Sequence, residues 1–463
     1  MVEVVAIETP TLGDRSYLAH DGGVAVVIDP QRDIDRVTAL AERHGVRITH
    51  VAETHIHNDY VSGGLALSRE AGAAYLVSAA DPVSFRREPV RDGDTVPISP
   101  AMRLRALDTP GHTFSHLSYA LEADGQVAGV FTGGSLLFGS TGRPDLLGPA
   151  STPALARAQH ASVQRLAREL PDSAEIFPTH GFGSFCAATQ AQSTASTIGR
   201  EKQYNPALTL AEGAYVEELL AGLDAYPSYY AHMGPANLAG PDGADLSPPR
   251  PAGPDQVRRA LQAGEWVIDL RDRVAFCAGH VPGSFSFPVD GSFASYLGWV
   301  LPWGTPVTLL GETPEQVARA QRELVRIGID RPAAAAAGAP EQWSDGRPLA
   351  RLRRATFGDL AAVVGRGGEG RQRIILDVRR RLEWEHGHVA GAIHIPFSEL
   401  PGRADEVPPG EVWVYCQSGY RATVAASILA ARGRQVISVD EDFGQAGPAG
   451  VTLASRGAPA QEG

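Results

Sequence analysis

Cysteine is scarce in this chain of 463 residues, and lysine is almost absent. The three cysteines, Cys186, Cys277 and Cys416, are too few and too far apart to form a disulfide framework, and an odd count is typical of a reducing compartment. Lys202 is the only lysine, so arginine supplies nearly all of the positive charge. Because 53 acidic residues outnumber 41 basic ones, the formal net charge is −12, which argues against nucleic acid or an anionic membrane as the main partner. We therefore expect small-molecule chemistry.

Long hydrophobic runs are also missing. No stretch approaches the roughly 18 consecutive apolar residues of a membrane span. The opening residues, MVEVVAIETP, lack the basic segment and the apolar run of a secretory signal, so we expect a cytoplasmic protein with no membrane association. A hydrophobic content of 43% with 20% charged residues is ordinary for a globular chain. At this length roughly two to four domains are expected.

Strand-like and helical patterns alternate from residue 1 to about 200. Short apolar runs such as VAVVID and VAGVFT alternate with helical patterns over 34–44 and 152–170, which indicates layers of mixed α/β structure. Residues 226–254 are rich in proline and glycine, and their composition predicts a linker.

Two segments after this linker repeat each other. VIDLRDRVAFCAGHVPGSFSFP (267–288) and ILDVRRRLEWEHGHVAGAIHIP (375–396) align without a gap. A period of about a hundred residues indicates two copies of a small domain, since the units of a solenoid are shorter. Apolar runs alternate with helical stretches in each copy, so we predict a doubly wound parallel sheet in both. The predicted domains are residues 1–225, the linker 226–254, and the two copies at 255–345 and 355–455.

A histidine-rich segment follows a strand-like run. In THIHNDYVSGG (54–64), His55 and His57 stand two residues apart in a turn, where both can point into one cavity, and imidazole suits zinc or iron. His112, in LDTPGHT, and His180, in IFPTHGFG, each follow an apolar run and lie beside glycine. These four histidines and Asp59 are predicted to converge on a metal site. The histidines that we expect to be ordinary surface or hydrogen-bonded residues are His20, His44, His50 and His116.

The same segment resembles the THxHxDHxxG signature of the metallo-β-lactamase superfamily, and PGHT and PTHG match the later histidine motifs of that superfamily in order. Within it, FTGGSLLFGSTGRPDL (131–146) and STIGREKQYNPALTL (196–210) resemble the persulfide dioxygenases more than the glyoxalase II hydrolases. The resemblance covers almost all of residues 1–210 and implies an αββα sandwich.

Two positions depart from this family. Tyr60 stands where the superfamily has a second histidine after Asp59, and Gly134 stands where persulfide dioxygenases have an aspartate that binds iron. The resemblance implies a single Fe(II), with zinc as an alternative, but glycine supplies no ligand, so the site either binds through histidine alone or has lost its metal. The resemblance maps the ligands of the family to His55, His112 and position 134. Without a side chain at 134, the three imidazoles that remain as candidate ligands are His55, His57 and His112.

The resemblance places further residues around the implied metal. Asp59, Tyr60, Gly134 and His180 are expected to line the pocket or to hold the ligands in place. Arg143, in the segment GRPD, either contacts an anionic group of the substrate or forms a salt bridge.

The second copy contains a cysteine at the start of a short loop. EVWVYCQSGYRATVAASILAARG (411–433) predicts a buried strand, a loop and a helix, with Cys416 where the loop begins. Backbone N–H groups of the loop, the helix N-terminus and the charge of Arg421 are expected to stabilise a Cys416 thiolate. The loop residues expected to surround a sulfur atom on this cysteine are Gln417, Ser418, Gly419 and Tyr420.

The segment CQSGYR resembles the active loop of rhodanese sulfurtransferases, and ILDVR and HGHVAGAIHIP match the opening signatures of that family. A cysteine-dependent phosphatase of the CX5R type is the rival interpretation, but its loop is one residue longer. The resemblance makes Cys416 and Arg421 the catalytic residues. The first copy has Gly311 at the position of Cys416, so we expect it to be an inactive rhodanese-like domain.

Together these resemblances imply an enzyme of sulfane-sulfur metabolism. A metal site would oxidise a low-molecular-weight thiol persulfide with O2 to sulfite, and Cys416 would move sulfur between persulfide, sulfite and thiosulfate. Two alternatives remain open: a sulfurtransferase whose first domain has lost redox chemistry, and a zinc thioester hydrolase of the glyoxalase II type. We expect a homo-oligomer with no nucleic-acid partner.

Overall fold

The computed structural model describes residues 2–188, 193–364 and 372–454. Residues 365–371 and residue 455 of the predicted second copy lie outside them. Two compact units share the chain. Unit 1 comprises Met1–Asp245 with Arg322–Asp330, and unit 2 comprises Leu246–Gln321 with Arg331–Gly463.

Unit 1 contains two mixed sheets. In the first, strands follow one another in sequence order: β1 (Glu3–Thr9), β2 (Asp14–His20), β3 (Val24–Ile28), β4 (Arg47–Ala52), β5 (Ala74–Ser78) and β6 (Glu88–Val90). The second has the order β11-β10-β9-β8-β7, with β7 (Thr95–Pro97), β8 (Met102–Asp108), β9 (Leu117–Ala123), β10 (Gln126–Gly133) and β11 (Glu175–Pro178). Strands β3 to β6 run parallel, as do β10 and β11.

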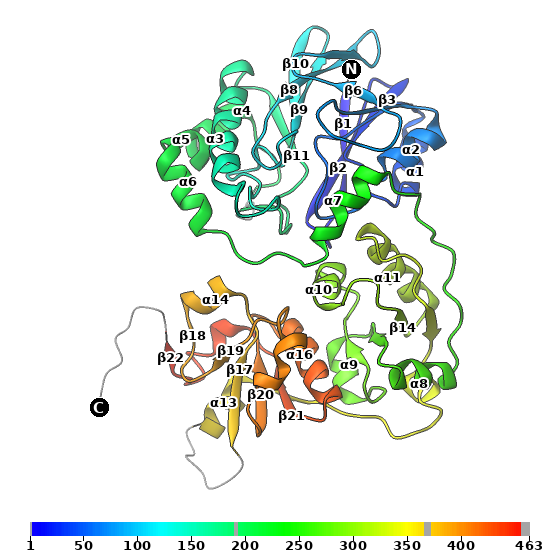
Figure 1. The fold of residues 1–463 in the computed structure, drawn as a ribbon, viewed down its shortest axis with the longest axis vertical. Coiled ribbons are helices and arrows are strands. Elements are labelled where there is room, and N and C mark those ends of the chain that lie inside the picture. Colours follow the sequence, from blue (N-terminus) through cyan, green and yellow to red (C-terminus); the bar gives the residue numbers. More distant parts are fainter. Residues whose placement is uncertain (1, 189–192, 365–371, 455–463) are drawn as a thin grey trace. The chain divides into compact units, whose positions relative to one another are not determined.

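Helices cover the outer face of each sheet, as Figure 1 shows. Those beside the first sheet are α1 (Asp35–His44) and α2 (Gly64–Ala71). Those beside the second include α3 (Thr152–Glu169) and α6 (Glu212–Ala221), with α4 (Ile198–Tyr204) and α5 (Pro206–Thr209) between them in sequence. The predicted helices at 34–44 and 152–170 are therefore confirmed.

Apolar clusters on both faces of the strands explain this layering. On β2, Tyr17 points between the two sheets, whereas the next residue, Leu18, points toward the helices. On β3, Val26 and Val27 alternate in the same way. A strand that is covered on both faces must be apolar on both, which is why these segments read as continuous hydrophobic runs. The result is the αββα sandwich expected for this part of the chain.

Part of the predicted linker is folded. Helix α7 (Tyr230–Ala239) lies within residues 226–254 and belongs to unit 1. Its buried Asn237 donates hydrogen bonds to the carbonyls of His57 and Tyr60, both at 2.9 Å, and accepts one from the Ser62 amide at 2.8 Å. Composition pointed to a linker because the segment contains Pro235 and several glycines, but these tertiary hydrogen bonds anchor the helix to the histidine-rich loop.

Unit 2 contains two parallel sheets, in agreement with the predicted fold class. The first has the order β13-β12-β14-β15, with β12 (Trp266–Asp269), β13 (Phe285–Ser286), β14 (Val307–Gly311) and β15 (Ala334–Ala337). The second has the order β16-β21-β20-β17-β19, with β16 (Arg353–Ala355), β17 (Arg373–Asp377), β19 (Ile393–His394), β20 (Glu411–Tyr415) and β21 (Gln435–Val439). A small antiparallel pair joins β18 (His388–Val389) to β22 (Leu453–Ala454).

Helices flank both sheets of unit 2 (Figure 1). Around the first sheet they are α8 (Pro254–Gln262), α9 (Arg273–Ala278), α10 (Phe293–Val300), α11 (Pro314–Arg326) and α12 (Pro340–Trp343). The last residues of α11, from Arg322 on, belong to unit 1. Around the second they are α13 (Phe357–Val364), α14 (Arg381–His386), α15 (Leu400–Arg403), α16 (Tyr420–Ala431) and the 3-10 turns Ala404–Glu406 and Phe443–Gln445.

The sequence repeat is preserved in hydrogen bonding. Arg271 forms an ion pair with Asp269 at 2.7 Å and donates to the Gly279 carbonyl. Arg379 forms the same ion pair with Asp377, also at 2.7 Å, and donates to the equivalent carbonyl of the second segment. The aligned residues thus perform the same structural task in both copies.

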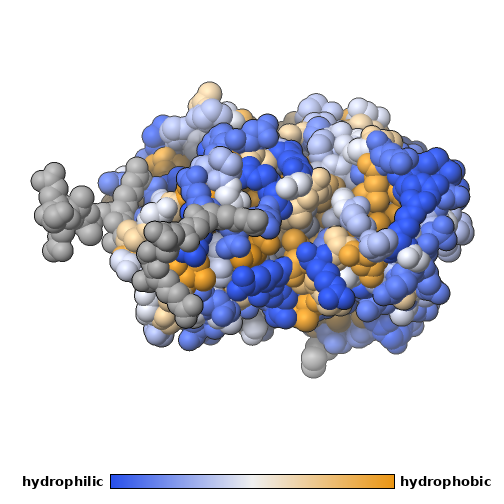
Figure 2. All heavy atoms as spheres, turned by 90° about the horizontal axis from the view of Figure 1, so that it is seen from below, coloured by the Kyte–Doolittle hydropathy of each residue, from blue (hydrophilic) through white to orange (hydrophobic). Residues whose placement is uncertain are grey.

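The face of the molecule in Figure 2 carries mostly hydrophilic residues. Figure 2 shows one face, on which hydrophobic residues form small patches between hydrophilic ones. No helix among these residues has the length and apolarity that a membrane crossing requires.

Candidate functional site

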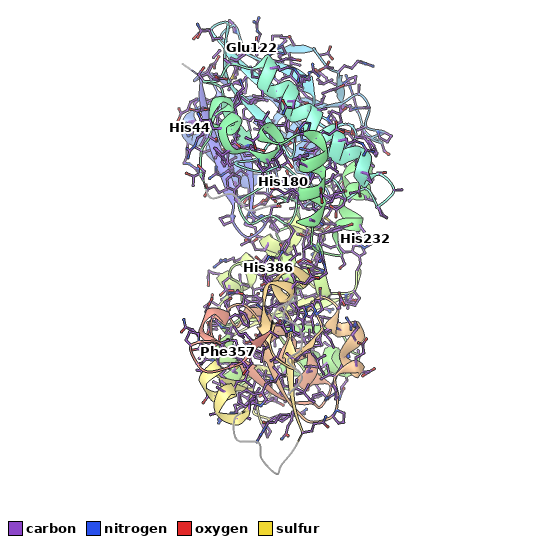
Figure 3. All side chains as sticks on the ribbon, turned by 90° about the vertical axis from the view of Figure 1, so that its left-hand side faces the viewer. His44, Glu122, His180, His232, Phe357 and His386 are labelled. Atoms are coloured by element: carbon purple, nitrogen blue, oxygen red, sulfur yellow. The ribbon has the colours of Figure 1, made fainter. Side chains whose placement is uncertain are left out.

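The histidine-rich loop joins β4 to α2, and the other histidines of the site follow nearby strands. His55 and His57 lie in that loop, His112 follows β8, and His180 follows β11. All four side chains are buried, and Figure 3 shows His180 inside unit 1. The structure therefore brings the four predicted histidines into one cluster.

The ring of His55 lies at the middle of this cluster. Its centroid is 4.1 Å from that of His57, 4.8 Å from His112 and 5.4 Å from His180. Burial and the neighbouring imidazoles lower the pKa of His55 well below its usual range and that of His112 to about 3. Both rings are thus held neutral, which is the form that binds a metal.

Three of the histidines are oriented through one ring nitrogen. Nδ1 of His55 lies 2.9 Å from Thr54 Oγ1, and Nδ1 of His112 lies 2.8 Å from the Arg143 carbonyl oxygen. Nδ1 of His180 lies 2.9 Å from a carboxylate oxygen of Asp14. Such contacts commonly fix the orientation of metal-binding histidines and leave Nε2 for the metal.

The remaining nitrogens point toward one another. Nε2 of His55 and Nε2 of His180 are 3.4 Å apart, and Nε2 of His112 has no hydrogen-bond partner among the described residues although it is buried. One ligand atom from each of these three residues lies within 4.8 Å of the others. Three convergent imidazoles with an unpartnered nitrogen fit a metal ion of the kind that histidine binds, such as zinc or iron.

His57, a predicted ligand, is turned toward carboxylates. Its Nε2 lies 3.2 Å from Glu53, 3.3 Å from Asp29 and 3.0 Å from the Tyr60 hydroxyl, while its Nδ1 is buried without a partner. Burial lowers the pKa of His57, but the two carboxylates outweigh this effect and raise it to about 9. A ligand atom of His57 lies within 4.8 Å of those of Asp29 and His55, and also groups with those of Asp59 and His180, but His57 shares no such group with His112.

Asp59 and Tyr60 hold other residues in place. One oxygen of Asp59 lies 3.2 Å from Nδ1 of His180, and its other oxygen is buried without a partner. The Tyr60 hydroxyl donates to the Asp29 carbonyl at 3.2 Å. Burial lowers the pKa of His180, but Asp59 and Asp14 raise it to about 10. Metal binding through Nε2 therefore has to displace a proton, so metal affinity at this residue falls with decreasing pH.

Gly134 is required by the position of His112. A Cβ at residue 134 would lie 2.3 Å from Cδ2 of His112, and one at Gly142 would lie 2.7 Å from Nδ1 of the same ring. The imidazole thus occupies the space that an aspartate at 134 would need. The departure from the family is matched by the surrounding packing.

The side chain of Arg143 is bound by other residues of unit 1. Its guanidinium forms two hydrogen bonds of 2.7 Å to the Asp145 carboxylate and donates to the carbonyls of Phe185 and Asp224. Of the two roles considered for this residue, the structure shows the salt bridge, in which the guanidinium is buried and the Asp145 carboxylate is partly exposed. The backbone of Arg143 also orients His112.

Several residues of the site were not singled out from the sequence. His116, expected to be an ordinary histidine, stacks on His55 with centroids 4.9 Å apart, and its Nε2 accepts a hydrogen bond from the Gly134 amide. Asp29 and Glu53 follow strands β3 and β4 directly, as His55 nearly does. Each of these two carboxylates directly follows a buried apolar run, and this position in the sequence could have identified them as residues of the site.

The cysteine loop joins β20 to α16, as predicted. Cys416 is 1% exposed, and its Sγ lies 3.2 Å from the Gly419 amide, which donates to it. Gly419 has a φ of +93°, and a Cβ there would lie 2.0 Å from Asp440. Glycine at this position therefore allows the loop to turn around the sulfur.

Arg421 is engaged by a carboxylate. Both terminal nitrogens of its guanidinium lie 2.6 Å from oxygens of Glu383, on α14. Burial raises the pKa of Glu383, but the hydrogen bonds and charge of Arg421 outweigh it and lower the pKa to about 2. The sequence predicted an arginine on the rim of the loop as a catalytic residue. In the structure its charge is neutralised, and its two-point contact fixes the start of α16.

The first copy contributes to the wall around this loop within unit 2. Tyr420 donates a hydrogen bond to the Pro288 carbonyl at 2.9 Å. The ring of Tyr296, on α10, lies 5.4 Å from that of Tyr420 and 5.0 Å from that of Phe397. The copy without a cysteine thus packs directly on the loop that has one.

Family models match two parts of the chain: "Metallo-beta-lactamase superfamily" at residues 12–180 and "Rhodanese-like domain" at residues 361–445. The human protein "Persulfide dioxygenase ETHE1, mitochondrial" is 30% identical over 212 residues, which are 45% of this chain and 74% of that protein. The chain belongs to the metallo-β-lactamase superfamily.

Other proteins similar to this chain are named for a different activity. "Hydroxyacylglutathione hydrolase" of Nitrosococcus oceani is 32% identical over 162 residues, or 35% of this chain, but the chain covers only 58% of that enzyme. A crystal structure of a metallo-β-lactamase from Staphylococcus aureus aligns with a TM-score of 0.65 and 29% identity, covering 73% of this chain and 99% of that one. The chain therefore belongs to this superfamily and contains a rhodanese-like domain.

Substitution of Gly134 tests the packing around His112. We expect Gly134→Ala and Gly134→Asp to lower the free energy of unfolding by roughly 1–3 kcal/mol, because overpacking forces neighbouring side chains to move. Thermal unfolding of the full chain, followed by circular dichroism, measures the change. Gly213→Ala is the control, since a Cβ at Gly213 meets no atom within 4 Å. Unchanged unfolding of the Gly134 variants would contradict the proposed packing.

Substitution of Glu383 tests the ion pair below the cysteine loop. The folded-state pKa of about 2 lies below the usual value of 4.5, so the carboxylate stabilises the fold above pH 4.5, and this stabilisation is lost as the pH falls toward 2. Glu383→Gln is expected to cost up to about 3 kcal/mol at pH 7 and much less near pH 3. Denaturant unfolding at several pH values checks this. Glu399→Gln, in an exposed pair with Arg403, should change little at any pH.

Proposed function

We propose that this chain oxidises a low-molecular-weight thiol persulfide to sulfite in unit 1 and transfers sulfane sulfur through Cys416 in unit 2. The observation that carries the first part is the buried histidine cluster in a chain 30% identical to the human persulfide dioxygenase over 74% of that protein. The second part is supported by the rhodanese-like match, which includes the loop that carries Cys416.

His55, His112 and His180 are the residues that we propose as holders of one Fe(II). Their ligand atoms form one compact group, and the unpartnered Nε2 of His112 supports a bound cation. This set replaces His57 of the sequence prediction with His180. Iron at this site would supply the redox chemistry with O2. Asp14 and the Arg143 carbonyl would hold two of the imidazoles in position.

The proposed oxidation is balanced by one O2 and one water. The S–S bond of the persulfide breaks, the terminal sulfur gives up four electrons, and O2 accepts them. The products are the free thiol, sulfite and two protons. Burial lowers the pKa of His55 and of His112, so a cation would not have to displace a proton from either of these two rings.

The proposed transfer step uses Cys416. Its thiolate attacks the terminal sulfur of a persulfide, the S–S bond breaks, and the thiol leaves as a thiolate. Sulfite then attacks the sulfur on Cys416, forms thiosulfate and regenerates the thiolate. The Gly419 amide, 3.2 Å from Sγ, donates to the anionic sulfur. Gln417 and Ser418 line the rest of the loop. In this proposal the first copy is an inactive rhodanese-like domain that completes the wall.

A zinc thioester hydrolase is the second candidate, and the similarity to the hydroxyacylglutathione hydrolase of Nitrosococcus oceani favours it. Three imidazoles also suit one catalytic zinc. The two candidates predict different substrates for the same histidines.

Removal of the histidine nitrogens tests the oxidation. Protein purified anaerobically is expected to contain about one iron per chain by elemental analysis and to consume O2 with glutathione persulfide. His55→Ala, His112→Ala and His180→Ala should each lower iron content and O2 consumption at least about 10-fold, because weaker perturbations around metal sites already have that effect. His160→Ala, in α3, is the control.

The pattern of these results separates the candidates. Iron loss in His57→Ala but not in His180→Ala would restore the ligand set predicted from the sequence. Zinc-dependent hydrolysis of S-lactoylglutathione without O2 consumption would replace the dioxygenase proposal by the hydrolase.

Removal of the thiol tests sulfur transfer. Cys416→Ala is expected to reduce thiosulfate sulfurtransferase activity, measured as thiocyanate formed from cyanide, to the background level because no other residue holds the sulfur. O2 consumption should persist in this variant. Cys277→Ala, which removes another buried cysteine of unit 2, is the matched control. Full transfer activity in Cys416→Ala would refute this part of the proposal.

A further inference from the structure

A second cluster of metal-binding side chains in unit 1 shares no residue with the histidine centre. Glu3, on β1, lies opposite His20, on β2, in the antiparallel pairing of these strands. His44 is the last residue of α1, and Figure 3 shows it at the outer edge of unit 1. One ligand atom from each of the three side chains lies within 4.8 Å of the others.

His20 is the residue that requires an explanation. It is only 5% exposed, yet neither of its ring nitrogens has a hydrogen-bond partner among the described residues. Buried polar groups in proteins are nearly always paired, so an imidazole with both nitrogens unpaired indicates a partner outside the protein chain. The ring of His44 lies beside it, with centroids 4.8 Å apart.

The spacing suits a shared cation better than a direct ion pair. Nε2 of His20 lies 3.7 Å from Oε2 of Glu3, which is longer than a hydrogen bond. Two ligands on one tetrahedral zinc, with bonds of about 2.0–2.1 Å, lie about 3.4 Å apart. Two imidazoles and one carboxylate are also a common ligand set for zinc with an open fourth position.

We propose that Glu3, His20 and His44 bind one divalent transition-metal ion, represented by Zn²⁺, at the surface of unit 1. The side chains of Glu3 and His44 are exposed, so the ion has access from solvent and keeps water in its remaining position. Such an ion would join β1 and β2 to the end of α1. Because it would bind the folded unit and not the unfolded chain, it would raise the temperature of unfolding.

The test counts zinc in the full chain by equilibrium dialysis after removal of metal with a chelator. The variant His55→Ala/His112→Ala, in which the buried centre is disabled, is expected to retain about one zinc per chain. Adding His44→Ala should remove this zinc, and adding Glu3→Gln should weaken its binding at least about 10-fold. His232→Ala, a histidine of α7 outside the cluster, serves as the matched control and should retain it.

A second measurement keeps the proposal testable if the double variant folds poorly. With the buried centre intact, the wild-type chain should bind one zinc more than His44→Ala, and added zinc should raise the unfolding temperature of the wild type more than that of the variant. Equal zinc content and equal thermal shifts would overturn the proposal. These results do not depend on persulfide oxidation, so failure here is distinguishable from failure of the proposed function.

Discussion

The packing of His112 against backbone constrains the whole histidine centre. The ring lies where side chains at Gly134 and Gly142 would otherwise be, and its Nδ1 is held by the carbonyl of the adjacent Arg143. Arg143 is in turn fixed by a part-buried salt bridge to Asp145. The position of one imidazole therefore depends on a chain of contacts through the loop that follows β10.

This constraint changes the meaning of the missing aspartate. A glycine at 134 removes a carboxylate ligand, and taken alone it suggests a damaged metal site. In the folded chain the same glycine admits His112, while Asp14 and Asp59 orient His180 toward it. The carboxylates of Asp14 and Asp59 thus act on the imidazole of His180.

Carboxylates with little exposure to water are paired with cations in both units. In unit 1, Asp29 and Glu53 lie against His57. In unit 2, Glu383 lies against Arg421, directly below the cysteine loop. In each case a carboxylate that is buried or half-buried is paired with a cation, because an unpaired charge away from water is strongly unfavourable. Among the buried polar atoms that have no partner in the described residues, Nε2 of His112 and both nitrogens of His20 are the ones that support bound metal ions.

The sequence by itself predicted the layers, the repeat and the residues of the two candidate sites. Alternating apolar runs predicted the α/β class, and motif spacing predicted that His55, His57, His112 and His180 converge and that Cys416 begins a loop before a helix. Only the tertiary structure decided which nitrogen of each ring is free, that Arg421 is neutralised by Glu383, and that α7 is anchored through Asn237. The reason is physical: periodicity reflects which face of an element is buried, whereas ligand choice and charge pairing depend on side chains that meet from distant parts of the chain.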